Sequence, residues 1–286
     1  MGIVTCSKCR ELTVSEKPLI PLLAALSLEA SPVVWNDKDT DWTGFDALLI
    51  RSIWDYHLYP EEFLTWLKKI ESFGIPVWNQ PNVLRWNCHK FYLRYLAGQG
   101  VNVVPSLFLR RGTTDALAQA LACGWSDVVV KPAVSASSYR THAFSLANPE
   151  ADSLLAEAAS HGDFLVQPLL TSIREHGELS LIFIDNEFSH AVLKKPGANE
   201  FRVQNEFGGQ AIAHQASQEI VQAARKVLAA TGMELLYARI DGVAGKGGFV
   251  LMELELIEPD LFLNLCPGSD KLFAERIARR LTPSAS

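Results

Sequence analysis

The stretch from Leu235 to Pro259, LLYARIDGVAGKGGFVLMELELIEP, carries three acidic side chains in a strand, turn, strand pattern. The turn at 244–248 contains three glycines, which tolerate the positive backbone angles of a tight reversal. Because strand side chains alternate faces, Glu253 and Glu255 share one face. Folding back about the turn brings Asp241 opposite Glu253. The stretch therefore predicts a hairpin with three carboxylates close together.

A divalent cation suits this hairpin. Carboxylates this close raise one another's pKa unless a cation neutralises them, and Mg²⁺, or Mn²⁺ in its place, prefers oxygen ligands. We therefore expect Asp241, Glu253 and Glu255 to hold a metal. The alternative is a solvated strand face on which Arg239 pairs with Glu255.

Composition favours a small ligand. The 286 residues, 48% of them hydrophobic, suit one large or two ordinary domains with a substantial core. The formal net charge of −6 gives no general attraction to nucleic acid or to an anionic membrane, so neither is expected as a partner. A homo-oligomer stays open. No apolar run approaches the roughly 18 residues of a membrane helix and the N-terminus lacks a signal-peptide pattern, so we expect a cytoplasmic protein.

The five cysteines are an odd number and argue against a disulfide framework. Cys6 and Cys9 form a CxxC, which suits metal binding or redox chemistry, or else two small residues at the end of a first strand. A structural zinc site needs two further ligands at characteristic spacing, and the other cysteines are isolated. The role of this pair stays open.

Strand and helix patterns alternate along the chain. Apolar strands at 2–6, 33–35, 47–50 and 75–78 and helical patterns at 19–28 and 60–73 predict a parallel α/β domain over about residues 1–85. Further strands are expected at 101–104, 107–109, 128–130, 143–146, 164–167, 179–184 and 188–193. Helices are expected at 88–97, where Asn87 could cap, and at 114–122, 152–159 and 217–231. Residues 282–286 are expected to be disordered.

Two lysines and one loop are candidates for contact with phosphate. Lys131 leaves a buried strand, and the small and hydroxyl residues 133–138, among them Ser135, let backbone N–H groups approach phosphate oxygens. Lys90 is expected in a first helical turn, where the macrodipole disfavours a cation unless an anion lies nearby. An ordinary loop and an exposed lysine are the alternatives.

Other residues could contact the base and the ribose. Gln167 ends a strand before a turn containing Leu169 and Leu170, whose backbone and apolar side chains could receive a planar base. Glu178 opens the next strand, where it could accept hydrogen bonds from ribose hydroxyls. Lys194, Lys195 and Arg202 form a basic patch that suits a triphosphate, unless these charges only pair with the acidic residues.

Taken in order, these residues resemble the ATP-grasp ligase superfamily, which includes glutathione synthetase and D-alanine:D-alanine ligase. The resemblance covers about residues 80–265. It implies an α/β and α+β architecture, the ATP-grasp fold, with an N-terminal parallel α/β domain (1–85), a central lid subdomain (86–170) and a C-terminal mixed-sheet subdomain with the metal site (171–286). ATP and Mg²⁺ would bind between the last two.

The resemblance also implies residue roles. Lys90 and Lys131 would bind phosphates, residues 167–170 would contact adenine, and Glu178 would lie near the ribose. Lys194 and Arg202 would neutralise the triphosphate, and Arg239 would stabilise charge that develops during transfer. Two departures are that Glu255 stands where many members have Asn, and that residues 133–138 have Ser and Ala where many have Gly.

A narrower resemblance rests on RSIWDY at 51–56, WND at 35–37 and ELELIEP at 253–259. This combination is similar to the ATP-grasp group containing the cyclo-ligase that closes O-ureidoserine to cycloserine. Arg51 would clamp a substrate carboxylate at a strand end, with Trp54 and Asp55 beside it. The alternative is an ion pair between Arg51 and Asp55.

The activity implied is that of an ATP- and Mg²⁺-dependent carboxylate–amine ligase or cyclo-ligase. A carboxyl of a small amino-acid-like substrate would be phosphorylated, and an amine, in the same or another molecule, would attack the acyl phosphate. A metal-dependent small-molecule kinase and a catalytically silent nucleotide-binding protein stay open as alternatives.

Overall fold

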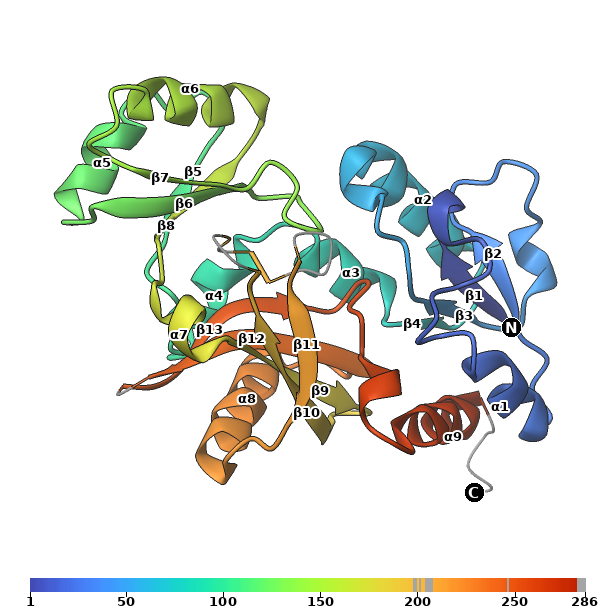
Figure 1. The fold of residues 1–286 in the computed structure, drawn as a ribbon. Helices are drawn as coiled ribbons and strands as arrows, with labels where there is room; N and C mark the ends of the chain where they lie inside the picture. Colours follow the sequence, from blue (N-terminus) through green and yellow to red (C-terminus); the bar gives the residue numbers. More distant parts are fainter. Residues whose placement is uncertain (198–199, 201, 204–207, 246, 282–286) are drawn as a thin grey trace.

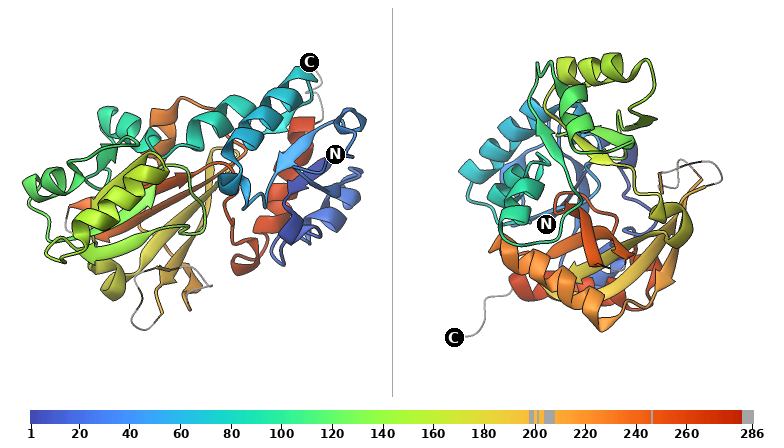
Figure 2. Two further views of the ribbon diagram at one scale, coloured as in Figure 1. Left: turned by 90° about the horizontal axis from the view of Figure 1, so that it is seen from above. Right: turned by 90° about the vertical axis from the view of Figure 1, so that its left-hand side faces the viewer.

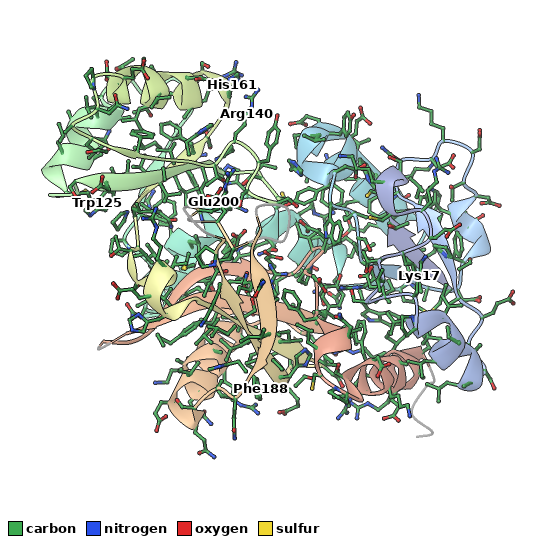
Figure 3. The ribbon with its side chains drawn as sticks, viewed as in Figure 1. Lys17, Trp125, Arg140, His161, Phe188 and Glu200 are labelled. Carbon is green, nitrogen blue, oxygen red and sulfur yellow. The ribbon has the colours of Figure 1, made fainter. Side chains whose placement is uncertain are left out.

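The computed structural model describes residues 1–197, 200, 202–203, 208–245 and 247–281. They form three sheets with helices around them (Figure 1). The tail that we expected to be disordered, 282–286, lies outside the described residues. Figure 3 places Trp125 in the left-hand part of the molecule and Lys17 in the right-hand part. Among the described residues, no helix has the length and apolar character needed to span a membrane.

The N-terminal sheet is parallel, as predicted. Its strand order is β2-β1-β3-β4, with β1 (Gly2–Thr5), β2 (Ser31–Val34), β3 (Leu48–Ile50) and β4 (Val77–Trp78). Side chains alternate between its two faces. Ile3 and Leu49 pack with helix α1 (Leu19–Ala25), whereas Val4 and Ile50 pack with helix α2 (Pro60–Ser72). Short 3₁₀ helices occupy Ser7–Cys9, Trp42–Gly44 and Tyr56–Leu58.

The second sheet is antiparallel, in the order β5-β8-β6-β7. Its strands are β5 (Leu107–Leu109), β6 (Asp127–Pro132), β7 (His142–Ser145) and β8 (Phe164–Pro168), and it packs with α5 (Ala116–Ala122) and α6 (Ala151–His161). Leu155, Val128 and Val166 belong to its separate core. Both helices lie on the same side of the sheet in Figure 1.

The helix expected at 88–97 is wrong in its bounds. The chain forms α3 (Pro81–Asn87) and α4 (Tyr92–Gly98) instead, and Lys90 lies between them. Asn87 caps no helix start, because its amide binds the backbone of a distant strand: Nδ2 donates to the Leu254 carbonyl (2.8 Å) and Oδ1 accepts from the Leu256 N–H (2.9 Å). The expected strand at 101–104 is reduced to one parallel bridge, between Val103 and Leu251.

The third sheet has the order β11-β10-β9-β12-β13. Its neighbouring strands all pair antiparallel. The mixed sheet that we expected is therefore present only in the single parallel bridge between Val103 and Leu251 of β13. Helix α8 packs on it and has Ser217 as N-cap, and the short α7 precedes β9. The elements are α7 (Ser172–His176), β9 (Glu178–Ile184), β10 (Glu187–Lys195), β11 (Gln210–His214), α8 (Gln218–Thr231), β12 (Tyr237–Gly245) and β13 (Gly248–Glu255).

The C-terminal helix α9 (Ser269–Leu281), preceded by a 3₁₀ turn at Leu263–Leu265, was not predicted. It lies beside α1, next to the N-terminal sheet (Figures 1 and 2). Phe273 and Ile277 share one core with Leu19 of α1 and Ile182 of β9. The N-terminal sheet and the third sheet are therefore joined by a continuous hydrophobic core, whereas the second sheet has its own.

Candidate active site

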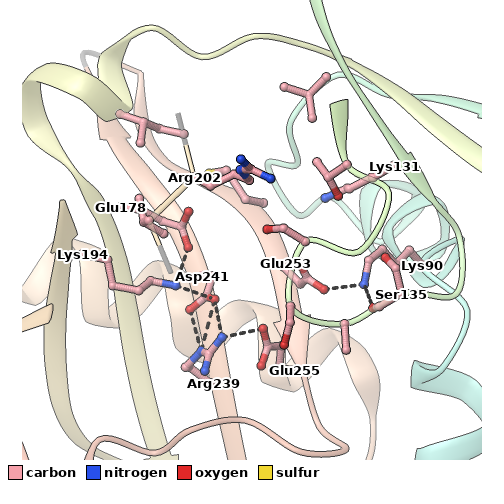
Figure 4. A pocket seen from close by; sticks show the side chains of 18 of the residues that line it. Lys90, Lys131, Ser135, Glu178, Lys194, Arg202, Arg239, Asp241, Glu253 and Glu255 are labelled. Carbon is pink, nitrogen blue, oxygen red and sulfur yellow. Dashed lines mark hydrogen bonds and ion pairs between the residues drawn. The ribbon is translucent and has the colours of Figure 1, made fainter. Parts of the chain in front are cut away.

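A cavity of about 330 Å³ is lined by residues from all three regions of the chain. Its lining is chemically mixed, since carboxylates and basic side chains lie around it beside apolar side chains (Figure 4). Of the candidate site residues, the structure brings these to the cavity: Trp54, Lys90, Lys131, Ser135, Gln167, Leu169, Leu170, Glu178, Lys194, Arg202, Arg239, Asp241, Glu253 and Glu255.

The acidic hairpin is formed by β12 and β13 as predicted. Asp241 is the register partner of Glu253, and Arg239 is the partner of Glu255. A register shift follows Asp241. The two glutamates project into the cavity from the same face of β13, and Asp241 projects from the neighbouring strand (Figure 4).

Asp241 is held by two cations. Its Oδ2 lies 2.9 Å from Lys194 Nζ and 3.0 Å from Arg239 Nη2, and its Oδ1 accepts a hydrogen bond from Ser180 Oγ (2.6 Å). Burial would raise the pKa of Asp241, but Arg239 and Lys194 lower it far below its usual range. Lys194 also contacts Glu178 Oε1 at 2.5 Å. Asp241 is therefore charged in the ligand-free protein.

The two glutamates of β13 differ in their surroundings. Burial raises the pKa of Glu255 to about 7, although Arg239 lies 2.5 Å away and opposes the shift. Glu253 contacts Lys90 Nζ at 2.6 Å. Its burial is outweighed by Lys90 and Lys131, so its pKa lies below the usual value. The Arg239–Glu255 ion pair that we considered as the alternative is present. It lines a cavity and does not lie on a solvated strand face, because the Arg239 side chain is 11% exposed and the Glu255 side chain 25%.

The three carboxylates do not form a preorganised metal site. In the part of the chain that the structure describes, no group of three His, Cys, Asp or Glu side chains is arranged to hold a metal ion. Each expected ligand instead contacts a lysine or an arginine. The hairpin therefore supplies oxygen donors whose charge is balanced by protein cations.

The two predicted phosphate lysines are both buried but differ in their partners. Lys90 Nζ contacts Glu253 and donates to the Ser135 carbonyl (2.8 Å). Lys131 forms no ion pair with any described residue, and burial lowers its pKa. A buried ammonium without a carboxylate is costly unless an anion compensates it. Lys131 therefore indicates an anionic ligand.

The loop after Lys131 takes an unusual backbone path. Ser137, Ser138 and Arg140 have φ values of 49°, 55° and 50°, in the left-handed region that favours glycine. Ser135 Oγ donates to the Pro132 carbonyl at 3.1 Å. Three residues that carry side chains thus adopt backbone angles in this loop that glycine adopts at least cost.

The apolar end of the cavity includes Leu169, Leu170 and Val104. Gln167 Nε2 donates to Ser106 Oγ (2.8 Å), which fixes its amide. Glu178 begins β9 directly after Gly177, whose φ is 80° and whose missing Cβ would lie 2.7 Å from the Lys194 carbonyl. Only glycine fits there, so this close approach determines where Glu178 enters the cavity.

Arg51 and Asp55 require a correction, because neither lines the cavity. Arg51 is fully buried and its Nε lies 2.9 Å from Glu16 Oε1, with the guanidinium 4.7 Å from the centre of the Tyr237 ring. Asp55 accepts a hydrogen bond from Trp35 Nε1 (2.7 Å). The structure therefore shows neither a direct substrate clamp nor an Arg51–Asp55 pair.

The remaining basic and sulfur residues have local roles. Arg202 Nη2 contacts Glu200 at 2.6 Å, and Lys195 is exposed. Cys6 is buried after β1, and burial together with Cys6 raises the pKa of Cys9 to about 11. The Cys9 thiol therefore remains protonated near neutral pH, which disfavours redox chemistry at this residue.

Tyr56 of the RSIWDY stretch also lines the cavity, and several further cavity residues were not anticipated from the sequence: Arg174, Glu258, Asp260 and Phe262. Glu258 stands in the ELELIEP stretch, three residues after Glu255. Since side chains of a strand alternate between its two faces, a continued strand would have put Glu258 on the face opposite Glu253 and Glu255. Because β13 ends at Glu255, the strand alternation no longer applies to Glu258.

Comparison with known proteins identifies relatives of this architecture. A family model described as the N-terminal domain of D-cycloserine synthetase DcsG matches residues 1–79. The cycloserine biosynthesis protein DcsG of Streptomyces lavendulae is 28% identical over 298 residues, covering 99% of each chain. The crystal structure of D-cycloserine synthetase DcsG superposes with a TM-score of 0.89 at 27% identity, covering 98% of this chain and 99% of the other.

More distant structures share the fold. D-alanine–D-alanine ligase from Bacillus anthracis has a TM-score of 0.69 at 15% identity, covering 98% of this chain and 96% of the other. A RimK-domain ATP-grasp protein from Sphaerobacter thermophilus DSM 20745 has a TM-score of 0.71 at 16% identity, covering 97% and 98%. The chain is a homologue of DcsG and an enzyme with the fold of the ATP-grasp ligases.

Proposed function

We propose that this enzyme is an ATP- and Mg²⁺-dependent ligase that activates the carboxyl of a small amino-acid-like substrate as an acyl phosphate. A nitrogen of the same molecule then attacks it and closes a ring. The observation that carries the proposal is the set of buried, alternating cations and carboxylates in one cavity, with Lys131 left uncompensated among the described residues. Full-length similarity to a protein named D-cycloserine synthetase supports ring closure as the first reaction to test.

Charge exchange explains how the site accepts ATP. Lys90 and Lys194 are engaged with carboxylates in the ligand-free chain. Phosphate oxygens would take over these cations and Lys131, and a divalent ion would take over the carboxylates. The cavity therefore stays near charge balance with and without its ligands. Gln167 and the apolar residues Leu169 and Leu170 would receive the base.

The donor set fits Mg²⁺, which prefers carboxylate oxygens combined with phosphate oxygens. Glu253 and Glu255 share one face of β13, and Asp241 stands across from Glu253, so these three residues would hold the ion. When bound, Mg²⁺ would neutralise negative charge on the phosphates. The resemblance to ATP-grasp ligases places Glu255 where many members have Asn, and the extra negative charge is balanced by Arg239.

Arg239 would stabilise the reacting carboxyl group. Its guanidinium is held by Asp241 and Glu255, and Nη1 donates to the Asp260 carbonyl (3.1 Å). A donor fixed before the reaction costs little reorganisation when negative charge develops. We assign it the role of stabilising the transferred phosphoryl group and the tetrahedral intermediate.

The chemical steps balance without a protein nucleophile. A substrate carboxylate oxygen attacks the γ-phosphorus of ATP, and the bond from that phosphorus to the bridging oxygen of ADP breaks. The substrate nitrogen then attacks the acyl carbon, the bond to phosphate breaks, and inorganic phosphate and a proton leave. One ATP yields one ADP, one phosphate and one new carbon–nitrogen bond.

The test is ADP release by the full chain with Mg²⁺ and ATP, using O-ureidoserine and, separately, common amino acids with and without amine donors. The products are identified by mass spectrometry. We expect ADP and a cyclised or amide product together. Lys131→Met should lower turnover at least about tenfold, whereas Lys226→Met, at an exposed position on α8, should not.

Two outcomes would favour the other classes. ADP and a stable phosphorylated product without a new carbon–nitrogen bond would indicate a kinase. ATP binding without ADP release in any mixture would indicate a silent nucleotide-binding protein.

A further inference from the structure

Glu258 lines the cavity but has no part in the metal or phosphate sites described above. It follows the end of β13, on the side of the cavity that Trp54 and Tyr56 of the N-terminal region also line. In the proposed reaction, we place the amino-acid substrate on this side of the cavity. The inference below rests on the proposed function.

The backbone that carries Glu258 is held by three side chains. Successive carbonyl groups each accept one hydrogen bond, which fixes the segment 258–260 against both the N-terminal region and β12. The bonds run from Trp54 Nε1 to Glu258 O (3.0 Å), from Arg51 Nη2 to Pro259 O (2.6 Å) and from Arg239 Nη1 to Asp260 O (3.1 Å). Arg51 is therefore a positioning residue for this segment.

The carboxyl of Glu258 is left for a ligand. Within the described ranges it forms no ion pair or side-chain hydrogen bond, although Glu253, Asp241 and Glu255 are each paired with a cation. Burial, and then the charge of Glu255, raise the pKa of Glu258 well above its usual range. A cation beside Glu258 would offset both the cost of burying its negative charge and the repulsion from Glu255.

We propose that the Glu258 carboxylate binds the free α-ammonium group of the amino-acid substrate. The ammonium donates to the carboxylate, and the apolar part of the substrate packs against Trp54 and Tyr56. Anchored at this end, the substrate directs its carboxyl toward Arg239 and the phosphate-binding lysines. The chemical class selected is a small amino acid with an unblocked primary amine.

Alternative occupants fit less well. A phosphate or a second carboxylate would add negative charge beside Glu255 and Glu258. A neutral group would leave the half-buried Glu258 carboxyl without a charged partner. An ammonium group satisfies the charge and the hydrogen bonds together.

The test is calorimetric titration of the full chain, saturated with Mg²⁺ and a non-hydrolysable ATP analogue, with O-ureidoserine and with N-acetyl-O-ureidoserine. The variants are Glu258→Gln, which keeps shape and hydrogen bonding without the charge, Glu258→Ala, and Glu62→Gln as a control on the exposed face of α2. Thermal melting verifies that each variant is folded.

We expect Glu258→Gln to weaken binding of O-ureidoserine at least about tenfold, with nucleotide affinity unchanged within about twofold. The N-acetyl compound should bind wild type weakly and lose nothing further in the variant, and Glu62→Gln should match wild type. The proposal is overturned if Glu258→Gln binds the free amine as wild type does, if both probes lose affinity equally, or if wild type binds neither probe.

This experiment needs no turnover, so it separates the two proposals. Binding of the amine through Glu258 without any ADP release in the wild type would refute the ligase function and keep the ammonium site. ADP release by the wild type, together with an affinity for O-ureidoserine that Glu258→Gln leaves unchanged, would support the ligase function and refute the ammonium site.

Discussion

The ion pair between Glu16 and Arg51 offers a sharp test of how the N-terminal region is held together. The Arg51 and Glu16 side chains are 0% and 5% exposed, and Nε lies 2.9 Å from Oε1. Removing one partner of a buried pair leaves the other charge uncompensated, which costs about 3–5 kcal/mol. Thr13 Oγ1 (3.0 Å) and Ser52 Oγ also donate to Glu16 and would lose their acceptor.

We therefore expect Glu16→Met to lower the free energy of unfolding by about 4 kcal/mol, and Arg51→Met to lower it by a similar amount. In the double variant no charge remains buried, and an apolar pair of similar volume restores most of the loss, to within about 2 kcal/mol of wild type. The two single effects should thus be strongly non-additive.

The assay is urea unfolding followed by tryptophan fluorescence. Trp35, Trp42 and Trp66 are buried in the same N-terminal region and report its unfolding. A cost below about 1 kcal/mol for Glu16→Met, as for a surface pair, would refute the reasoning. So would a double variant as unstable as the sum of the single ones.

Three further predictions follow from the site. Gly177→Ala should cost about 2 kcal/mol, because its φ is 80° and its Cβ would meet a carbonyl, whereas Gly162→Ala, with open space around it, should be nearly neutral in the same urea assay. Equal effects would contradict this. Lys131→Met should raise the melting temperature of the ligand-free protein, since it removes an uncompensated buried cation, while nucleotide affinity falls; a lower melting temperature would count against that reasoning. Mg²⁺–ATP affinity should rise from about pH 6 to about pH 8 as Glu255 loses its proton, and Glu255→Gln should flatten the profile. The sign for stability is opposite: a carboxyl whose pKa is raised from 4.5 to about 7 binds its proton more tightly when folded, so its contribution declines as pH rises through that interval.

Elements with strong local signals could be predicted from the sequence. The β12–β13 hairpin was expected because three glycines mark the turn and the acids alternate with apolar residues, and Asp241 does pair with Glu253. Helix α8 was expected from its apolar period and from Ser217, which caps it. These features depend on neighbours within a few residues, so the sequence displays them directly.

Features set by distant partners could not be predicted. Asn87 looked like a helix cap, but its amide binds backbone groups of Leu254 and Leu256, far along the chain. Arg51 was expected to meet Asp55 or a substrate, and it meets Glu16, which the fold of the first loop brings to it. Pair identities of this kind depend on tertiary contacts and not on spacing.

Helix α9 was missed because its buried stripe is narrow. Phe273, Ala274 and Ile277 are its buried apolar residues, and six of its other residues are charged: Asp270, Lys271, Glu275, Arg276, Arg279 and Arg280. Arg280 contacts Asp185 at 2.6 Å, and Arg276 and Arg279 contact it as well. The helix is held by packing on α1 and by this aspartate, neither of which is visible locally.

The continuous core that α9 shares with α1 has a consequence for building hybrid enzymes. The family model ends at residue 79, yet Phe273 and Ile277 pack against Leu19 and Leu23. A chimaera that exchanged residues 1–79 alone would place these two side chains against foreign neighbours. The exchangeable module is therefore discontinuous: the first 79 residues must travel together with the C-terminal helix.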